Sequence, residues 1–268
     1  MTDPLRTAVE TAREAGALLR RLGTGPLDAR EKGARGDLVT AADRASERLI
    51  VERLQAAFPG SAILGEEDGE RAGDTGERWI VDPLDGTTNY LHGYPLYCVS
   101  IAYERDGDVL AGAIYAPALD ATFAAARGRG ATCDGKPIAV SQPEAVADAM
   151  VCTGFKPADY DRNSEHFAHL SRVAQAVRRD GSAALDLAFV ANGTFDAFWE
   201  FDLKIWDVAA GALIVREAGG TVSAIDGSVY APGAGSILAT NGRVHAEMCA
   251  ELAIASGAAR LRAEIRRP

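Results

Sequence analysis

Apolar residues recur at helical spacing in two segments near the start of the chain. In the first segment they occupy every third or fourth position, at Leu5, Val9, Ala12, Gly16 and Leu19. This spacing predicts a helix over 4–23, with Thr2 or Asp3 as its N-cap. A second helix is predicted over 40–58, where a Pro-Gly pair closes it.

The pattern then changes to short apolar runs separated by turn residues, as strands require. Two of these runs, "SAILG" and "RWIVD", lead directly to acidic residues. A longer segment, "LYCVSIAYERDGDVLAGAIYAP", is typical of a hairpin turned at Asp106-Gly107, and 121–140 predicts two further strands. Together these segments predict an antiparallel meander packed on the two helices.

A weak boundary falls near "SQPEAVAD", and strands and helices alternate beyond it. Strands are predicted at "AMVCTG", "FDAFWEF", "TVSAI" and "SILAT". Helices are predicted over 163–177, 182–192, 207–218 and from about 243 onward. The sequence therefore predicts an α/β (α+β) protein with an N-terminal domain over 1–142 and a mixed C-terminal domain over 143–268.

Composition disfavours several classes of function. The chain has 268 residues, of which 47% are hydrophobic and 25% charged, as in folded globular proteins. Its formal net charge of −10 argues against broad binding to nucleic acid or to a membrane, because both need a basic surface. Four cysteines without CxxC spacing indicate free thiols in a reducing compartment. No leader-like segment or long apolar run occurs, so a cytoplasmic protein is predicted.

Acidic residues gather at the ends of predicted elements. They are Glu66 and Glu67 after one strand, Asp82 and Asp85 after another, and Asp207 at the start of a helix. Carboxylates that converge repel one another, and a hard divalent cation such as Mg²⁺ relieves that repulsion because it prefers oxygen ligands. The pattern therefore indicates a metal site.

The stretch "WIVDPLDGTTNYLHGYP" indicates how such a site would be arranged. Asp82 and Asp85 are spaced to bracket two ions, with the Leu84 carbonyl turned inward between them. Gly86 and Thr87 would then offer backbone N–H groups to an anion, as helix N-termini do. The segment thus combines cation ligands with an anion-binding turn.

Each acid also fits a simpler structural role. Turns such as "GEEDG" and "LDG" are common on protein surfaces. Asp43 and Asp207 stand where an acid caps a helix and interacts favourably with its dipole. The metal site is still favoured, because three separate segments bring acids to element ends.

Five segments carry a more specific pattern. In chain order they are "GDLVTAAD" at 36–43, "GEE" at 65–67, "DPLDGTTN" at 82–89, "GSAALDLAFVANGTFDAFWE" at 181–200 and "WDVAAG" at 206–211. Together they resemble the inositol monophosphatase family, within the Mg²⁺-dependent, Li⁺-sensitive phosphomonoesterases. The resemblance covers most of the chain. It implies an α-β-α-β-α layered sandwich, hydrolysis of inositol-1-phosphate and usually a homodimer.

The resemblance implies a role for each residue that matches the family's motifs. Ligands of two Mg²⁺ ions are implied at Glu66, Asp82, the Leu84 carbonyl, Asp85 and Asp207. Catalytic groups that activate the attacking water are implied at Asp43, Thr87 and Glu66. Contacts to the phosphate and the sugar-like alcohol are implied at Asp85, Gly86, Thr87, Ala183, Glu200 and Asp207.

Three further positions bear on this site. Lys32 matches a lysine in the loop near a third, weaker metal, so two to three ions are implied. Glu67 either contacts the site through water or only shapes its turn. Lys204 stands where some animal members carry a histidine, which leaves the substrate open among inositol monophosphates, fructose 1,6-bisphosphate and histidinol phosphate. The "GTTNY" segment resembles the inositol and fructose-bisphosphate branches more than the nucleotide branch of the family.

Two other functions compete with a metal-dependent phosphatase. A haloacid-dehalogenase-type phosphatase needs aspartates two positions apart, whereas here Pro83 follows Asp82 and the next aspartate is Asp85. A metal-loaded regulatory or interaction protein would keep the fold without turnover, yet both Asp43 and Thr87 are present. The favoured function is therefore hydrolysis of a small phosphorylated polyol by a metal-activated water, without a covalent enzyme intermediate.

Overall fold

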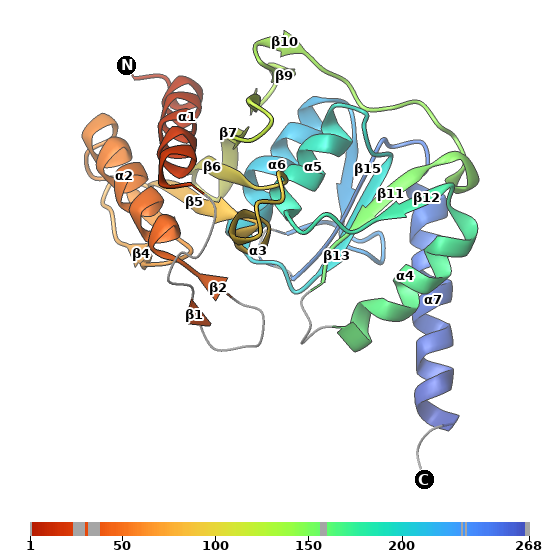
Figure 1. The fold of residues 1–268 in the computed structure, drawn as a ribbon. Helices are drawn as coiled ribbons and strands as arrows, with labels where there is room; N and C mark the ends of the chain where they lie inside the picture. The colour runs from red at the N-terminus through yellow and green to blue at the C-terminus, as the bar shows by residue number, and fades with distance from the viewer. Residues whose placement is uncertain are drawn as a thin grey trace.

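The chain folds into five layers, which Figure 1 shows from one side to the other. The computed structural model describes residues 2–23, 30–31, 38–155, 160–231, 233 and 235–265. In the order of the layers, the helices are α1 (Pro4–Leu22) and α2 (Ala41–Ala57), then α5 (Ala183–Ala191) and α6 (Ile205–Glu217), then α4 (Tyr160–Val173) and α7 (His245–Ile265). An eight-stranded sheet separates the first pair from the second, and a five-stranded sheet separates the second from the third. This arrangement confirms the predicted α-β-α-β-α layered sandwich.

The first two helices begin and end close to their predicted limits. Asp3 caps α1 by accepting a hydrogen bond from the Leu5 N–H at 3.0 Å, and Gly23 ends the helix. Thr40 caps α2 by accepting one from the Ala42 N–H, also at 3.0 Å. These caps act within a few residues, which is why the pattern alone could predict where both helices begin.

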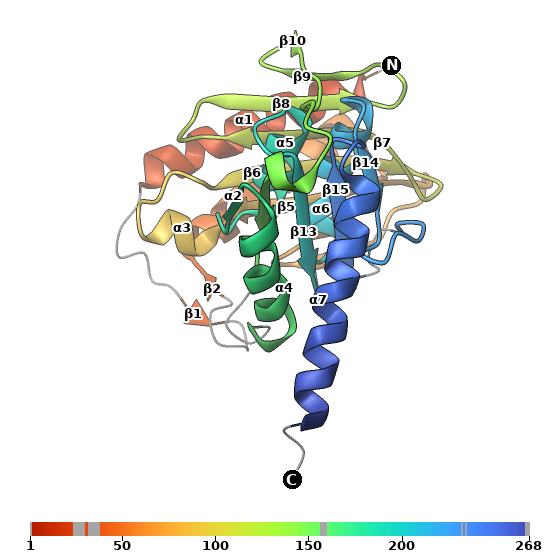
Figure 2. The same ribbon diagram turned by 90° about the vertical axis from the view of Figure 1, so that its right-hand side faces the viewer.

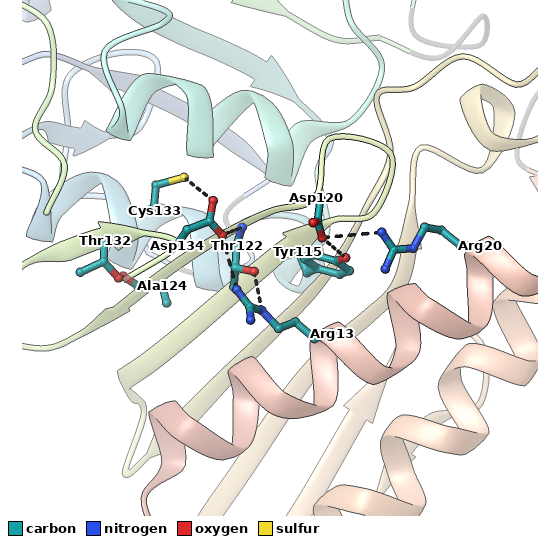
Figure 3. A network of polar contacts seen from close by, with 9 residues as sticks. All are labelled: Arg13, Arg20, Tyr115, Asp120, Thr122, Ala124, Thr132, Cys133 and Asp134. Carbon is teal, nitrogen blue, oxygen red and sulfur yellow. Dashed lines mark hydrogen bonds and ion pairs between the residues drawn. The ribbon is translucent and has the colours of Figure 1, made fainter. Parts of the chain in front are cut away.

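Polar contacts fasten α1 to the strands beneath it, as Figure 3 shows. Arg13 lies 3.4 Å from Asp134, and Arg20 lies 3.6 Å from Asp120. Asp120 also accepts a hydrogen bond from the Tyr115 hydroxyl at 2.8 Å. Exposed ion pairs contribute only about 0–1 kcal/mol each. Their effect is therefore to fix the position of the helix more than to stabilise the fold.

The eight-stranded sheet contains the predicted meander. Its strands are β3 (Ala62–Gly65), β4 (Gly69–Arg71), β5 (Glu77–Asp85), β6 (Cys98–Arg105), β7 (Asp108–Ala116), β8 (Ala121–Ala126), β9 (Ala131–Cys133) and β10 (Lys136–Pro137). Their order is β10-β9-β8-β7-β6-β5-β3-β4, and all neighbours are antiparallel except β3 and β5. The β6–β7 hairpin turns at Asp106 and Gly107, as predicted. The short strands β4 and β10 were not predicted.

The segment between α1 and α2 contributes a small separate ribbon. Strands β1 (Arg30–Glu31) and β2 (Leu38–Val39) pair in antiparallel register, and neither strand was predicted from the sequence. Lys32, the residue implied near a third metal, lies outside the described residues.

The five-stranded sheet corrects one predicted boundary. Its strands are β11 (Met150–Thr153), β12 (Ala176–Arg178), β13 (Ala197–Phe201), β14 (Thr221–Ser223) and β15 (Ser236–Thr240). The helix predicted over 163–177 ends at Val173, and Val177 lies instead in β12, paired with Val151. Val173 and Val177 continue the helical spacing, but a parallel strand pairing is a long-range contact that local spacing cannot show. The predicted helix over 207–218 starts slightly earlier, at Ile205.

Helices α4 and α7 lie side by side on the outer face of this sheet, as Figures 1 and 2 show. His169 of α4 lies 2.5 Å from Glu251 of α7, and His166 lies 2.9 Å from Ser256. Met248 of α7 belongs to an apolar cluster beneath them. The outer layer therefore combines a buried apolar contact with polar pairs near its edge.

One apolar core joins the two sheets. It includes Ile80 and Ile114 from the first sheet and Phe198 and Ile237 from the second, with α5 and α6 between them. Since this core spans both halves, the division into domains at 142 stays a prediction. All four cysteines are free, as predicted. No helix among the described residues combines the length and the apolar character that crossing a membrane requires.

Candidate active site

The end of strand β5 is irregular where the candidate acids lie. Asp82 pairs with β6 in regular register, whereas Asp85 pairs only after a shift in register. Pro83 lies in this gap and has no N–H to donate to the sheet. Its carbonyl accepts a hydrogen bond from the Ser46 hydroxyl of α2 at 2.8 Å. An irregularity of this kind redirects the side chains at a strand end.

A tight turn follows and leads into a short helix, α3 (Thr87–Leu91). Gly86 has φ of 90°, a left-handed conformation that glycine adopts without strain. The Leu84 N–H donates to Asp82 at 3.0 Å, and the Thr87 hydroxyl lies 3.2 Å from the Leu84 carbonyl oxygen. The predicted ligand carbonyl and the predicted catalytic hydroxyl therefore face each other across this turn.

Asp82 lies at the centre of an acidic cluster. Its side chain is 1% exposed. Burial raises its pKa well above the ordinary value, and repulsion from Glu66, Asp85 and Asp207 raises it further. The structure thus brings together the four carboxylates that the sequence places on three separate segments.

The start of α5 holds Asp85. One carboxylate oxygen of Asp85 accepts hydrogen bonds from the Ser182 hydroxyl at 2.8 Å and from the Ala184 N–H at 2.7 Å. Burial raises the pKa of Asp85 to about 6, although these hydrogen bonds lower it. Ala183 lies in the same first turn of the helix and is 7% exposed. Sequence reasoning missed Ser182 as a site residue, because only its place as the predicted helix start was visible.

Asp43 makes the contacts that both of its predicted roles would use. One of its carboxylate oxygens accepts hydrogen bonds from the Thr40 N–H at 2.8 Å and the Thr40 hydroxyl at 2.5 Å, so it caps α2. The other oxygen accepts from the Thr87 hydroxyl at 3.0 Å. Burial raises the pKa of Asp43, and these hydrogen bonds lower it. The cap thereby fixes the carboxylate that faces Thr87.

The loop that carries Glu66 is anchored by a second buried acid of α2. Glu47 accepts hydrogen bonds from the backbone N–H groups of Glu67 and Asp68, both at 2.9 Å. Its side chain is 2% exposed. Sequence reasoning missed Glu47, although it follows Asp43 by one helical turn on the apolar face of α2, where a solvated acid is not expected.

Asp207 also combines a cap with a place in the cluster. One of its carboxylate oxygens accepts a hydrogen bond from the Lys204 N–H at 2.6 Å, at the start of α6. Lys204 itself is exposed and lines a cleft of about 240 Å³. The remaining lining residues are Asp202, Leu203, Ile205, Trp206, Gly233 and Gly235. This cleft lies directly beside Asp207 in the chain.

Glu200 occupies the end of strand β13, where it pairs with Ile237 of β15. Its carboxylate packs closely against Gly154, because a Cβ at that position would lie 2.2 Å from a Glu200 oxygen. A side chain at Gly154 would therefore displace the Glu200 carboxylate. The backbone of Gly154 in this way sets the position of the predicted substrate contact.

The set of donors around Asp82 suits a hard divalent cation. The predicted ligands are Glu66, Asp82, the Leu84 carbonyl, Asp85 and Asp207. They offer only oxygen atoms, which Mg²⁺ prefers. A cation among them would relieve the repulsion that raises the pKa of Asp82.

Comparisons with known proteins agree with this geometry. A model of the inositol monophosphatase family matches residues 1–257. The chain is 43% identical over 253 residues to an inositol-1-monophosphatase of Synechocystis sp., covering 93% of this chain and 88% of that one. It is 42% identical over 253 residues to Nus factor SuhB of Pseudomonas aeruginosa, covering 90% and 92% of the two chains. A solved inositol monophosphatase from Anabaena (Nostoc) sp. is 41% identical, with a TM-score of 0.83 over 92% of this chain and 94% of that one. The chain therefore belongs to the inositol monophosphatase family.

Proposed function

We propose that this protein is a Mg²⁺-dependent phosphomonoesterase that hydrolyses inositol-1-phosphate to inositol and phosphate. The observation that carries the proposal is the acidic cluster around Asp82, next to a Thr87 hydroxyl held by Asp43. The cluster would hold cations, and the hydroxyl would orient a water. The name of the Synechocystis relative supports the choice of substrate.

Five residues would bind the two Mg²⁺ ions that this reaction needs. Glu66, Asp82 and the Leu84 carbonyl would hold one Mg²⁺ ion. Asp82, Asp85 and Asp207 would hold the other. Bound Mg²⁺ supplies an activated water and stabilises the leaving oxygen.

The remaining residues orient the reactants. Asp43 accepts the hydroxyl hydrogen of Thr87, so that the Thr87 oxygen can accept a hydrogen bond from the attacking water. The backbone N–H groups of Gly86 and Thr87, at the turn into α3, would bind phosphate oxygens. Ala183 and Glu200 would contact the alcohol part of the substrate.

A non-catalytic regulatory role is the second candidate function. It is favoured by the similarity to a protein named Nus factor SuhB. Related sugar phosphatases, which act on fructose 1,6-bisphosphate or histidinol phosphate, are the alternatives within the enzyme class. We also propose that the protein forms a homodimer and is located in the cytoplasm.

Phosphate release from a panel of esters tests the proposal. Inositol-1-phosphate, fructose 1,6-bisphosphate, histidinol phosphate and a 3′-phosphoadenosine nucleotide would each be assayed over a range of Mg²⁺ concentrations. We expect release to require Mg²⁺ and kcat/KM to be highest for the inositol ester. A folded protein that releases phosphate from none of them would favour the regulatory function. A different best substrate would place the chain in another branch of the family.

Replacing Glu200 by alanine should alter substrate preference more than chemistry. If its carboxylate accepts hydrogen bonds from polyol hydroxyls, its loss leaves polar groups unpaired at a cost on the order of 1–3 kcal/mol. We therefore expect kcat/KM for inositol-1-phosphate to fall by roughly 10- to 100-fold. Steady-state kinetics with inositol-1-phosphate and with p-nitrophenyl phosphate would measure the effect.

The second ester is the control, because it lacks the polyol hydroxyls and should be hydrolysed almost as before. Equal losses on both esters would place Glu200 in the catalytic machinery. Unchanged kinetics on both would make it a surface acid without contact to substrate.

A further inference from the structure

A second group of potential metal ligands lies where β11 meets the start of α5. The Cys152 sulfur and one carboxylate oxygen each of Asp180 and Asp186 all lie within 4.8 Å of one another. Cys152 belongs to β11, Asp180 precedes α5, and Asp186 lies within that helix. The proposed phosphatase chemistry uses none of these three residues.

Asp186 is the member that most needs a partner. Its side chain is 1% exposed, and neither carboxylate oxygen has a hydrogen-bond partner among the described residues. Buried carboxylates are normally satisfied by donors, as Asp85 is by Ser182 and Ala184. The Cys152 thiol interacts with Asp186 and lowers the pKa of its carboxyl, but it does not reach full hydrogen-bond geometry, and a thiol is only a weak donor.

The surroundings of Asp186 are acidic as well as buried. Burial raises the pKa of Asp186 well above its ordinary value, and the charges of Asp180, Glu200 and Asp85 raise it further. Burial also raises the pKa of the Cys152 thiol, and the neighbouring Asp186 and Asp180 add to that effect. Burial and the neighbouring acids thus disfavour the charged form of both groups, an effect that a bound cation would offset.

We propose that Cys152, Asp180 and Asp186 form a binding site for Zn²⁺, distinct from the oxygen-lined site around Asp82. A thiolate is a soft ligand that suits Zn²⁺ and does not suit Mg²⁺. Three protein ligands leave the fourth tetrahedral position to water. Cys152 and Asp186 release their protons to solvent as the ion binds. Asp180 is only half-buried, so an ion could reach the site from solvent past its side chain.

The bound ion would restrict the movement of segment 180–184, which positions Asp85. The carbonyl of Asp180 accepts a hydrogen bond from the Asn89 side chain at 2.8 Å, and Ser182 lies two positions further along the same segment. Cross-linking β11 to this segment would limit its movement. Because the ion binds the folded chain and its ligands are scattered in the unfolded one, we also expect it to raise Tm.

Co²⁺ is the probe for this site, because it occupies Zn²⁺ sites and gives intense near-ultraviolet charge-transfer absorption when bound to a thiolate. The titration would use the full chain with Mg²⁺ in large excess, so that Mg²⁺ fills oxygen-lined sites. We expect a charge-transfer band that saturates at one equivalent of Co²⁺ and disappears when Zn²⁺ is added. Absence of that band would overturn the proposal, whatever the protein's activity as a phosphatase.

Three variants locate the site. Cys152→Ser should abolish the band, and Asp186→Asn should weaken Co²⁺ binding by at least about tenfold, the loss that even a change in a supporting group produces. Cys133→Ser is the matched control, because the Cys133 sulfur also lies beside an acid, 3.8 Å from Asp134 (Figure 3), but has no third ligand among the described residues. The control should keep the band.

Circular dichroism would show which variants fold. If Cys152→Ser does not fold, the Co²⁺ affinity of the Asp186→Asn variant tests the proposal instead. A band that persists in a folded Cys152→Ser protein, full Co²⁺ affinity in Asp186→Asn, or loss of the band in Cys133→Ser would each contradict the assignment.

Discussion

The Asp82→Asn substitution is expected to lower kcat by on the order of 10³-fold, at the upper end of the loss that follows removal of one preorganised electrostatic contact. Asp82 is buried at the centre of the acidic cluster and is the residue proposed to serve both ions. Its loss should therefore disturb the activated water and the stabilised leaving oxygen together. Phosphate release from inositol-1-phosphate at saturating Mg²⁺ would measure the effect.

The fold should survive this change. An asparagine oxygen can still accept the Leu84 N–H, which now donates to Asp82 at 3.0 Å. Removing one of four clustered carboxylates also relieves repulsion, so Tm measured without metal should stay level or rise. Asp207→Asn should lower kcat less, because Asp207 is assigned to one ion only. Asp120→Asn is the control, since that side chain is 80% exposed and pairs with Arg20 in the last turn of α1. Near-normal turnover by Asp82→Asn would contradict the assignment.

Local signals in the sequence predicted the elements whose limits are set locally. The cap at Thr40, the glycine after α1 and the turn at Asp106-Gly107 each act within a few residues. Strand β12 could not be predicted in this way, because Val177 is in a strand only through its pairing with Val151. The same limit explains the missed short strands, which exist only through their neighbours.

The residues of the candidate site likewise fall into those with a local sequence signal and those defined by long-range contacts. Its acids could be predicted because each stands at the end of an element and within a specific motif. Ser182 could not, because its contact to Asp85 joins residues 97 positions apart. Glu47 offered a usable signal, since a buried acid on the apolar face of a helix needs a structural or functional reason. The cluster around Asp186 offered no such signal in the sequence, because its three proposed ligands have no recurring spacing in the chain.

Replacing Asp43 by asparagine tests whether the contact to Thr87 is catalytic. Asp43 now accepts from Thr40 with one oxygen and from Thr87 with the other. An asparagine has a single acceptor oxygen, so if it keeps the helix cap it presents an amide N–H₂ group to Thr87. The hydroxyl of Thr87 would then accept where it now donates, so its hydrogen would be free to point at the attacking water and only one of its two lone pairs would remain for that water.

We therefore expect kcat of the Asp43→Asn variant to fall by about 10²-fold or more. The Mg²⁺ concentration for half-maximal activity should hardly change, because Asp43 is not a proposed ligand. A residue that only caps a helix would behave in the opposite way, with a stability change of roughly 0.5–2 kcal/mol and normal turnover. Steady-state kinetics and thermal unfolding of the same preparation would separate these outcomes.

Thr87→Ala completes the test, because two residues that act as a unit lose their effect together. The double variant Asp43→Asn/Thr87→Ala should be scarcely slower than either single variant. Both single variants should keep their Mg²⁺ dependence, which distinguishes them from the changes at Asp82 and Asp207. Fully additive losses would mean that Asp43 and Thr87 contribute separately. The hydrogen bond between them would then be part of the fold of this turn, and the water would have to be oriented by another group.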